Sequence, residues 1–148
     1  MLKSFAEFAD IVAKHTELNA VALFQEGTAD LSRKVAIDTP VDTGRATANW
    51  KGGVNRNPEG SSNIFDKSPT AKKTYDILKK DIKKAKLKDT IIVRNAVNDG
   101  TEDGEFYIRK LENGPLDGGS TQAPTGMFMK NMVNAKKSFK KTKKRIGL

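Results

Sequence analysis

Cysteine is absent from this chain of 148 residues, aromatic residues make up 7% of it, and there is a single histidine. Without cysteine, neither a disulfide bond nor a thiolate-bound metal ion can hold the fold together. The histidine, His15, has no cysteine or second histidine with which to form a usual transition-metal site. We therefore expect no metal and no other cofactor.

Long apolar runs are also missing. No stretch approaches the roughly 20 residues that cross a bilayer. Residues 1–7 lack the apolar core of a signal peptide. The absence of cysteine suits synthesis in a reducing cytosol, and no membrane partner is expected.

The motifs of common catalytic sites are missing or stand in the wrong context. The sequence has no phosphate-binding glycine loop followed by Lys-Ser or Lys-Thr, and no Gly-x-Ser-x-Gly element. The acidic residues of segment 98–105 lack the alternating oxygen ligands and the twelfth-position glutamate of a calcium loop. We predict a protein that is not an enzyme.

One triplet, Asp42-Thr43-Gly44, matches the active site of retroviral-type aspartic proteases, in which two such aspartates share a proton across a dimer. There the triplet follows a buried apolar strand. Here it follows Thr39-Pro40-Val41 and precedes Arg45, a cation that opposes the protonation one carboxyl needs. A turn is the favoured interpretation, and a protease remains a remote alternative.

The net charge of +9 is concentrated in two segments. Residues 67–88 carry +7, residues 136–148 also carry +7, and the rest of the chain carries −5. Such stripes suit nucleic acid, oppositely charged neighbours or simply a solvated helix face. The candidate charged contact surface consists of Lys72, Lys73, Lys79, Lys80, Lys83, Lys84, Lys140, Lys141, Lys143, Lys144 and Arg145.

Hydrophobic periodicity predicts two N-terminal helices, over residues 2–14 and 17–37, with a bend near Gly27 and an end before Pro40. Alternation in residues 45–51 predicts a strand that puts Ala46, Ala48 and Trp50 on one face and breaks at the following glycines. A helix is expected over 69–86, a strand over 90–94, and a strand or a short turn of helix over 106–112. Exposed loops are expected over 55–68, 98–105 and 113–126, and a last helix from about 124.

These elements predict an α+β fold in which a small antiparallel β-sheet packs with a long N-terminal helix, a middle lysine-rich helix and a C-terminal helix. At 148 residues the chain is expected to form a single domain. Its parts are N-terminal helices over 1–38, a sheet core over 39–135 with the inserted helix 69–88, and a basic tail over 136–148. By itself the tail is expected to be frayed or only partly helical, and to become ordered against an acidic partner surface or DNA. A hydrophobic content of 36% is low, so some faces are expected to be buried only in an assembly.

Three elements in order resemble the neck and tail-completion proteins of tailed bacteriophages, the family that includes the minor tail protein Z group. The first contains Thr39, Pro40, Val41, Asp42, Thr43, Gly44, Arg45 and Trp50. The second has Glu112 and Gly114 in a Tyr-x-x-x-x-Glu-x-Gly pattern, and the third has Gln122, Ala123, Pro124 and Gly126 before a final helix. Together they span about 40–127, whereas the lysine helix and the basic tail lie outside the motifs.

The resemblance implies a structural virion protein, made in the host cytoplasm, that forms a ring joining neck to tail. Its partners would be copies of itself, six by preference or twelve, with neck or connector proteins, a tail terminator or tail tube, and DNA in the channel. It implies no catalytic residue. An Arg45–Glu112 contact would link two of the motifs, with a surface arginine as the alternative. A basic nucleic-acid-binding module is the competing hypothesis, although aromatics are few and no recognition-fold signature is present.

Overall fold

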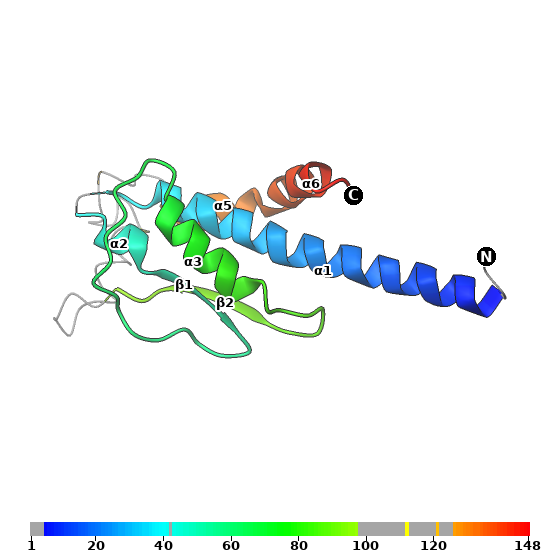
Figure 1. Cartoon of the computed structure of the whole chain (residues 1–148). Coiled ribbons are helices and arrows are strands. Elements are labelled where there is room, and N and C mark those ends of the chain that lie inside the picture. The colour runs from blue at the N-terminus through cyan, green and yellow to red at the C-terminus, as the bar shows by residue number, and fades with distance from the viewer. Residues whose placement is uncertain (1–4, 42, 98–111, 113–120, 122–125) are drawn as a thin grey trace.

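The computed structural model describes residues 5–41, 43–97, 112, 121 and 126–148 (Figure 1). The described elements are, in chain order, α1 (Phe5–Asp38), α2 (Arg45–Ala48), β1 (Trp50–Val54), α3 (Lys72–Ile82), β2 (Ile91–Asn95), α5 (Phe128–Val133) and α6 (Ala135–Arg145). They form a helix-dominated α+β fold with a two-stranded antiparallel sheet, as predicted. The predicted loop 98–105, nearly all of strand 106–112 and nearly all of loop 113–126 lie outside the described residues.

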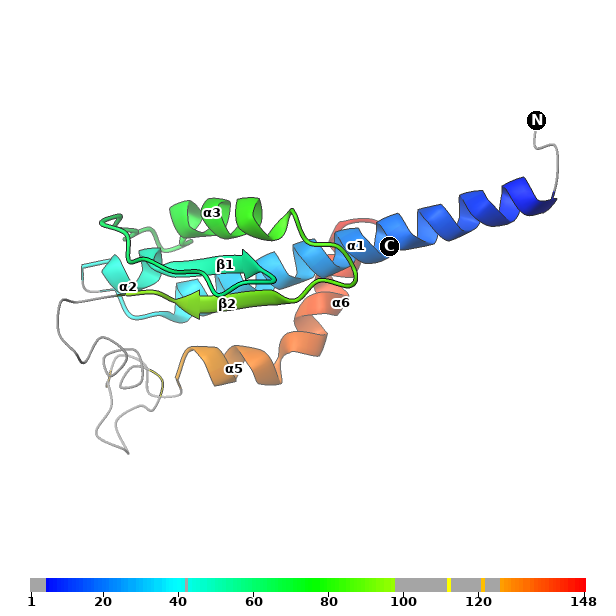
Figure 2. The same cartoon turned by 90° about the horizontal axis from the view of Figure 1, so that it is seen from below.

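Helix α1 runs without interruption for 34 residues, so the prediction of two N-terminal helices is wrong. The segment between them, Lys14 to Glu17, is polar but contains no helix breaker. Thr16 donates its hydroxyl hydrogen bond to the Val12 carbonyl (2.8 Å), one helical turn back. The polar gap therefore marks an exposed part of one helix, and residues 6–18 are all exposed. This half of α1 projects beyond the rest of the molecule in Figures 1 and 2.

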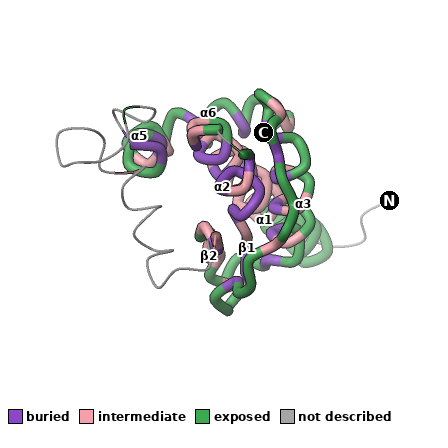
Figure 3. Tube along the Cα trace, turned by 90° about the vertical axis from the view of Figure 1, so that its left-hand side faces the viewer, coloured by how far each residue is buried: buried purple, intermediate pink, exposed green. Residues whose placement is uncertain are grey.

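The second half of α1 is the spine of the body. Helix α3 packs on one side of it and α5 and α6 on the other, while the sheet lies along it (Figure 2). Viewed end-on, the buried positions of the short helices face the centre and their outer sides are exposed (Figure 3). The core consists of Ala29, Val35, Ala36, Ala46, Trp50, Ala71, Leu78, Ile82 and Met127.

The sheet pairs Trp50 with Asn95 and Val54 with Ile91. The predicted strand 45–51 is wrong over most of its length, because Arg45–Ala48 forms the helical turn α2 and the strand begins at Trp50. Gly52 and Gly53, expected to break the strand, are part of it. A Cβ on Gly52 would come 3.2 Å from Ile82 of α3, so glycine lets the helix lie close against the strand.

The lysine-rich helix and the following strand agree well with their predicted patterns. Leu78 and Ile82 are buried along the expected apolar stripe of α3, and Ala85, also buried, follows the end of this helix. The β-branched run forms β2 at 91–95. The last predicted helix divides at Asn134 into α5 and α6. The segment 136–148, expected to be frayed or only partly helical by itself, is helical as far as Arg145, because α6 (Ala135–Arg145) packs along α1.

At Gly27 of α1 the ring of Phe139 from α6 lies close to the helix backbone. A Cβ at this residue would overlap the ring of Phe139, so glycine here makes room for an aromatic side chain instead of bending the helix. Docking at Gly27 gives α6 an apolar anchor among its lysines. The order of the C-terminal helix therefore comes from tertiary contact and not from its own sequence.

Gly27→Ala tests this anchor. In an exposed helix the change stabilises by about 1 kcal/mol, but crowding against Phe139 should reverse the sign and destabilise by about 1–2 kcal/mol. Urea unfolding measures both variants against the parent. In a Phe139→Leu background the same change should cost less, because the ring no longer meets the new methyl group. A Gly27→Ala chain that is more stable than the parent contradicts the anchor.

Candidate functional site

The first sequence motif connects the end of α1 to the start of β1. Thr39 is 1% exposed, and its hydroxyl donates to the Val35 carbonyl (2.9 Å) while accepting a hydrogen bond from the Trp50 indole Nε1 (2.8 Å). Trp50 itself is 4% exposed. The indole thus fills part of the core, and its buried hydrogen bond to Thr39 joins the start of β1 to the end of α1. The role of Thr39 and Trp50 within the motif is therefore to pack the core.

The turn within the motif depends on Gly44. Its φ of +80° lies in the left-handed region, and its carbonyl accepts hydrogen bonds from the amides of Ala48 (3.1 Å) and Asp66 (3.0 Å). A Cβ there would come 2.8 Å from the Asp66 carbonyl, so both conformation and space favour glycine. Asp42 lies outside the described residues, so the protease and turn interpretations of its side chain remain untested.

Asn49, also within the motif, is fully buried and connects three segments. Its side-chain amide donates to the Arg45 carbonyl (2.8 Å), and its side-chain oxygen accepts from the Ser62 amide (2.8 Å). Its backbone carbonyl accepts from the Ala96 amide (2.8 Å). The motif therefore holds the 55–68 loop and the exit of β2 in place.

Asp66 is a structural residue that the sequence analysis did not single out. It is 1% exposed, and its carboxylate accepts from the Ser68 hydroxyl (2.6 Å) and amide (3.0 Å) and from the Thr74 amide (2.9 Å) and hydroxyl (3.0 Å). Burial works to raise the pKa of Asp66, but these hydrogen bonds outweigh it and lower the pKa below its usual value. The sequence does contain a signal for this role: an aspartate shortly before the helix start at Ser68-Pro69 is a residue type that accepts hydrogen bonds from the free amides of a first helical turn.

Glu112, from the second motif, caps α5. Its carboxylate accepts hydrogen bonds from the amides of Met127 (2.9 Å), Phe128 (2.7 Å) and Met129 (2.7 Å). A Cβ on Gly126 would contact Glu112, and the φ of Gly126 is +67°, so this motif glycine lets the two segments meet. The described partners of the Glu112 carboxylate are thus backbone amides and not the expected Arg45. Gly114, Gln122, Ala123 and Pro124 lie outside the described residues.

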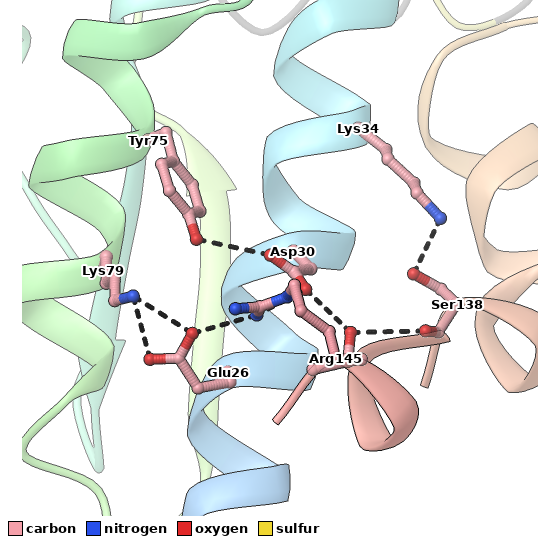
Figure 4. A network of polar contacts seen from close by, with 8 residues as sticks. Glu26, Asp30, Lys34, Tyr75, Lys79, Ser138 and Arg145 are labelled. Carbon is pink, nitrogen blue, oxygen red and sulfur yellow. Dashed lines mark hydrogen bonds and ion pairs between the residues drawn. The ribbon is translucent and has the colours of Figure 1, made fainter. Parts of the chain in front are cut away.

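The two basic segments flank the same part of α1. Glu26 accepts from Lys79 of α3 (2.9 Å) and from Arg145 of α6 (3.1 Å), and Asp30 accepts from Arg145 (2.9 Å) and the Thr142 hydroxyl (2.7 Å) (Figure 4). The Tyr75 hydroxyl also donates to Asp30 (3.3 Å). These contacts form the carboxylate clamp, Glu26 and Asp30, which binds both lysine-rich helices to the spine. The sequence analysis listed its cations but not its acids.

The clamp carboxylates are ionised in the fold. Their side chains are 23% and 21% exposed, and this partial burial works to raise the pKa of each. Hydrogen bonds to Lys79 and Arg145 at Glu26, and to Thr142 and Arg145 at Asp30, more than offset burial and lower both pKa values. Conversely, burial and the Asp30 charge raise the pKa of Tyr75.

The remaining candidate lysines lie on outer faces. In α3 the pair Lys72–Asp76 (3.0 Å) is a surface contact. Lys73 and Lys80 of this helix are exposed, and so are Lys83 and Lys84, which follow its end. In α6 all six lysines are exposed: Lys136, Lys137, Lys140, Lys141, Lys143 and Lys144. Arg145 and Lys79 thus have a structural role in the clamp, whereas the other lysines present charge to the surroundings.

A second surface lies on the projecting half of α1. Phe8, Ile11, Val12 and Leu18 are between 45% and 60% exposed and recur at helical spacing.

No described helix is long and apolar enough to cross a membrane. Within the described residues, no group of three or more histidines and acidic side chains is arranged to hold a metal ion.

Comparison of the chain with protein-family models, with curated proteins and with solved structures finds no match.

Asp30→Asn should loosen α6. The amide has no charge to attract Arg145, and its single carbonyl oxygen cannot replace both carboxylate oxygens, one of which accepts from Tyr75 and the other from Thr142 and Arg145, at a cost of about 1–3 kcal/mol. Hydrogen exchange at the α6 amides should accelerate more than exchange in α3. Asp10→Asn, on the exposed half of the same helix, provides the control and should leave both rates unchanged. Equal protection of α6 in the two variants would argue against the clamp.

The lowered pKa of Asp66 predicts that the free energy of unfolding decreases in acid. Because its folded pKa is lowered, its contribution is fully present above the unfolded pKa of about 3.9 and is lost as the pH falls through the folded value. Glu26 and Asp30 act in the same direction. Urea unfolding between about pH 7 and pH 2 should show this loss, and Asp66→Asn should be less stable at neutral pH with a shallower acid dependence. An unchanged pH profile in Asp66→Asn contradicts the assignment.

Proposed function

We propose that this protein is a structural subunit of the head–tail junction of a tailed bacteriophage, where it forms a ring that joins the neck to the tail. The proposal rests on the resemblance of three sequence elements to neck and tail-completion proteins. The described parts of these elements have internal structural roles: Trp50 and Thr39 pack the helix end, Gly44 makes the turn, and Glu112 caps α5. Such a motif suits a scaffold whose function is its shape.

The structural observation that supports assembly is the exposed apolar row on α1. Wheel positions of Phe8, Ile11, Val12 and Leu18 fall on one side of the helix, and each side chain is half exposed. Burying such side chains contributes about 1.5–3 kcal/mol each. These side chains are already about half buried, so the helix gains part of that energy when another protein surface covers the row. Such a row suits a subunit of an assembly.

The position of this row also favours a head-to-tail arrangement. It lies on the projecting half of α1, beyond α3, α6 and the sheet (Figure 1). A projecting element that meets the body of the next copy makes a heterologous contact, and such contacts close into rings when the rotation allows. Six copies are preferred by the resemblance, and twelve are the alternative. Subunits held on a preformed neck or tail end would need only weak contacts, since their effective concentration is high.

The test introduces charge into the exposed apolar row of this chain, and the variant replaces the parent chain in the phage to which the proposal assigns it. Ile11→Asp together with Leu18→Asp should leave the unfolding temperature unchanged, because both side chains are already exposed, yet particles should lack joined tails. Ala6→Asp with Ala13→Asp adds the same charge to another face of the same helix and should assemble normally. Electron microscopy of the particles scores tail attachment.

Cryo-electron microscopy of the parent particle completes this experiment. The expected result is density for the chain as a closed ring between neck and tail, with the α1 row against a neighbouring subunit. A chain located elsewhere in the particle, or missing from it, would overturn the proposed function. Normal tails in the Ile11/Leu18 variant would instead remove the role of the row.

A further inference from the structure

A groove of about 460 Å³ lies between the second half of α1 and helix α6. Its lining is dominated by cations and comprises Asp30, Arg33, Lys34, Ile37, Ser138, Lys141, Thr142 and Arg145. Asp30 is the carboxylate of this lining, and its charge is already engaged by Arg145 (2.9 Å). The other three cations therefore set the charge of the groove.

Two of those three cations have neutral partners and the third, Lys141, has no ion pair among the described residues, so their charge is not compensated. Lys34 donates to the Ser138 hydroxyl (2.8 Å), as Figure 4 shows. Arg33 donates to the Thr70 carbonyl (3.2 Å) and lies over the Tyr75 ring, 4.9 Å from its centre. Lys141 is exposed at the rim and has no ion pair among the described residues. The fold thus orders two of the cations without neutralising them.

Helix α6 extends this positive surface. Lys137, Lys141 and Lys144 are spaced four and three residues apart, so they share one face of the helix. They span about 10 Å along its axis. Residues 126–148 contain no acidic residue that could neutralise them. A row of cations beside a cationic groove is a surface for an extended polyanion with closely spaced charges.

We propose that the α1–α6 groove and the row Lys137, Lys141 and Lys144 bind the phosphate backbone of double-stranded DNA without base selectivity. A duplex carries about one charge per 1.7 Å of axis, so several phosphates come within reach of the row. The row consists of lysines, which bind phosphates as point charges, and contacts to phosphates carry no sequence information. This site is separate from the apolar row of α1 and does not depend on the ring assignment.

The experiment measures binding of the whole chain to a fluorescently labelled mixed-sequence duplex of about 20 base pairs, by anisotropy over a salt series. The triple variant Lys137→Gln, Lys141→Gln and Lys144→Gln should bind more weakly, and its log–log salt slope should be shallower by about 2.7, or 0.9 for each lost phosphate contact. Its unfolding temperature should match that of the parent, because the three side chains are exposed.

The matched control removes the same charge from α3 and the turn that follows it, through Lys73→Gln, Lys80→Gln and Lys84→Gln, which are exposed as well. It should retain most of the parent affinity and slope. Within α6, Lys141→Gln at the groove rim should weaken binding more than Lys143→Gln on the far side. Equal losses in the two triples would show that net charge alone attracts DNA, and would overturn the site.

Competition by a second polyanion distinguishes a nucleic-acid site from a site for an acidic protein. Poly-glutamate of matched charge should compete with the duplex poorly. If poly-glutamate binds more tightly than DNA, or the parent chain binds no duplex at low salt, the surface serves an acidic protein partner or none and the DNA proposal is wrong. The Ile11/Leu18 variant should bind DNA like the parent, so failure of the ring proposal and failure of this one give different results.

Discussion

The pairing of Glu26 and Asp30 with cations from two helices is the interaction on which the arrangement of this molecule depends. Helices α3 and α6 are both rich in lysine, and like charges placed near each other repel. Between them lies α1, whose two carboxylates accept from Lys79 on one side and Arg145 on the other (Figure 4). Partial burial weakens screening by water and makes these pairs stronger than exposed ones. The clamp thus permits a basic protein to hold two basic helices in one body.

The clamp also explains why α1 has two different halves. The half that carries Glu26 and Asp30 is covered by α3, α6, α5 and the sheet, and its buried residues belong to the core. The other half has no described neighbour and remains exposed, apolar row included. A helix of 34 residues is about 50 Å long, longer than a body of this size can cover. The excess length is the part that we propose meets another subunit.

Charge and apolar surface are therefore separated in space. The lysines of α6 surround a groove on the body, whereas the apolar row lies on the projecting helix. A ring subunit could use both, one for its neighbour and one for the DNA that passes. The two proposals nevertheless stand on different residues, and each can fail alone.

The sequence by itself determined the fold class, helix α3, strand β2 and the buried position of Trp50. Each of these depends on local pattern: a helical apolar stripe that ends in Leu78 and Ile82, a β-branched run, and a large indole beside small residues. The tertiary structure decided the rest. Residues 45–48 alternate like a strand, yet they turn as a helix because the carbonyl of Gly44 anchors both Ala48 and Asp66. The sequence of α6, by itself too charged to form a stable helix, is ordered because Phe139 packs on Gly27 and Arg145 reaches the clamp. Those partners lie more than 100 positions away in the chain, and no local periodicity records a contact over such a distance.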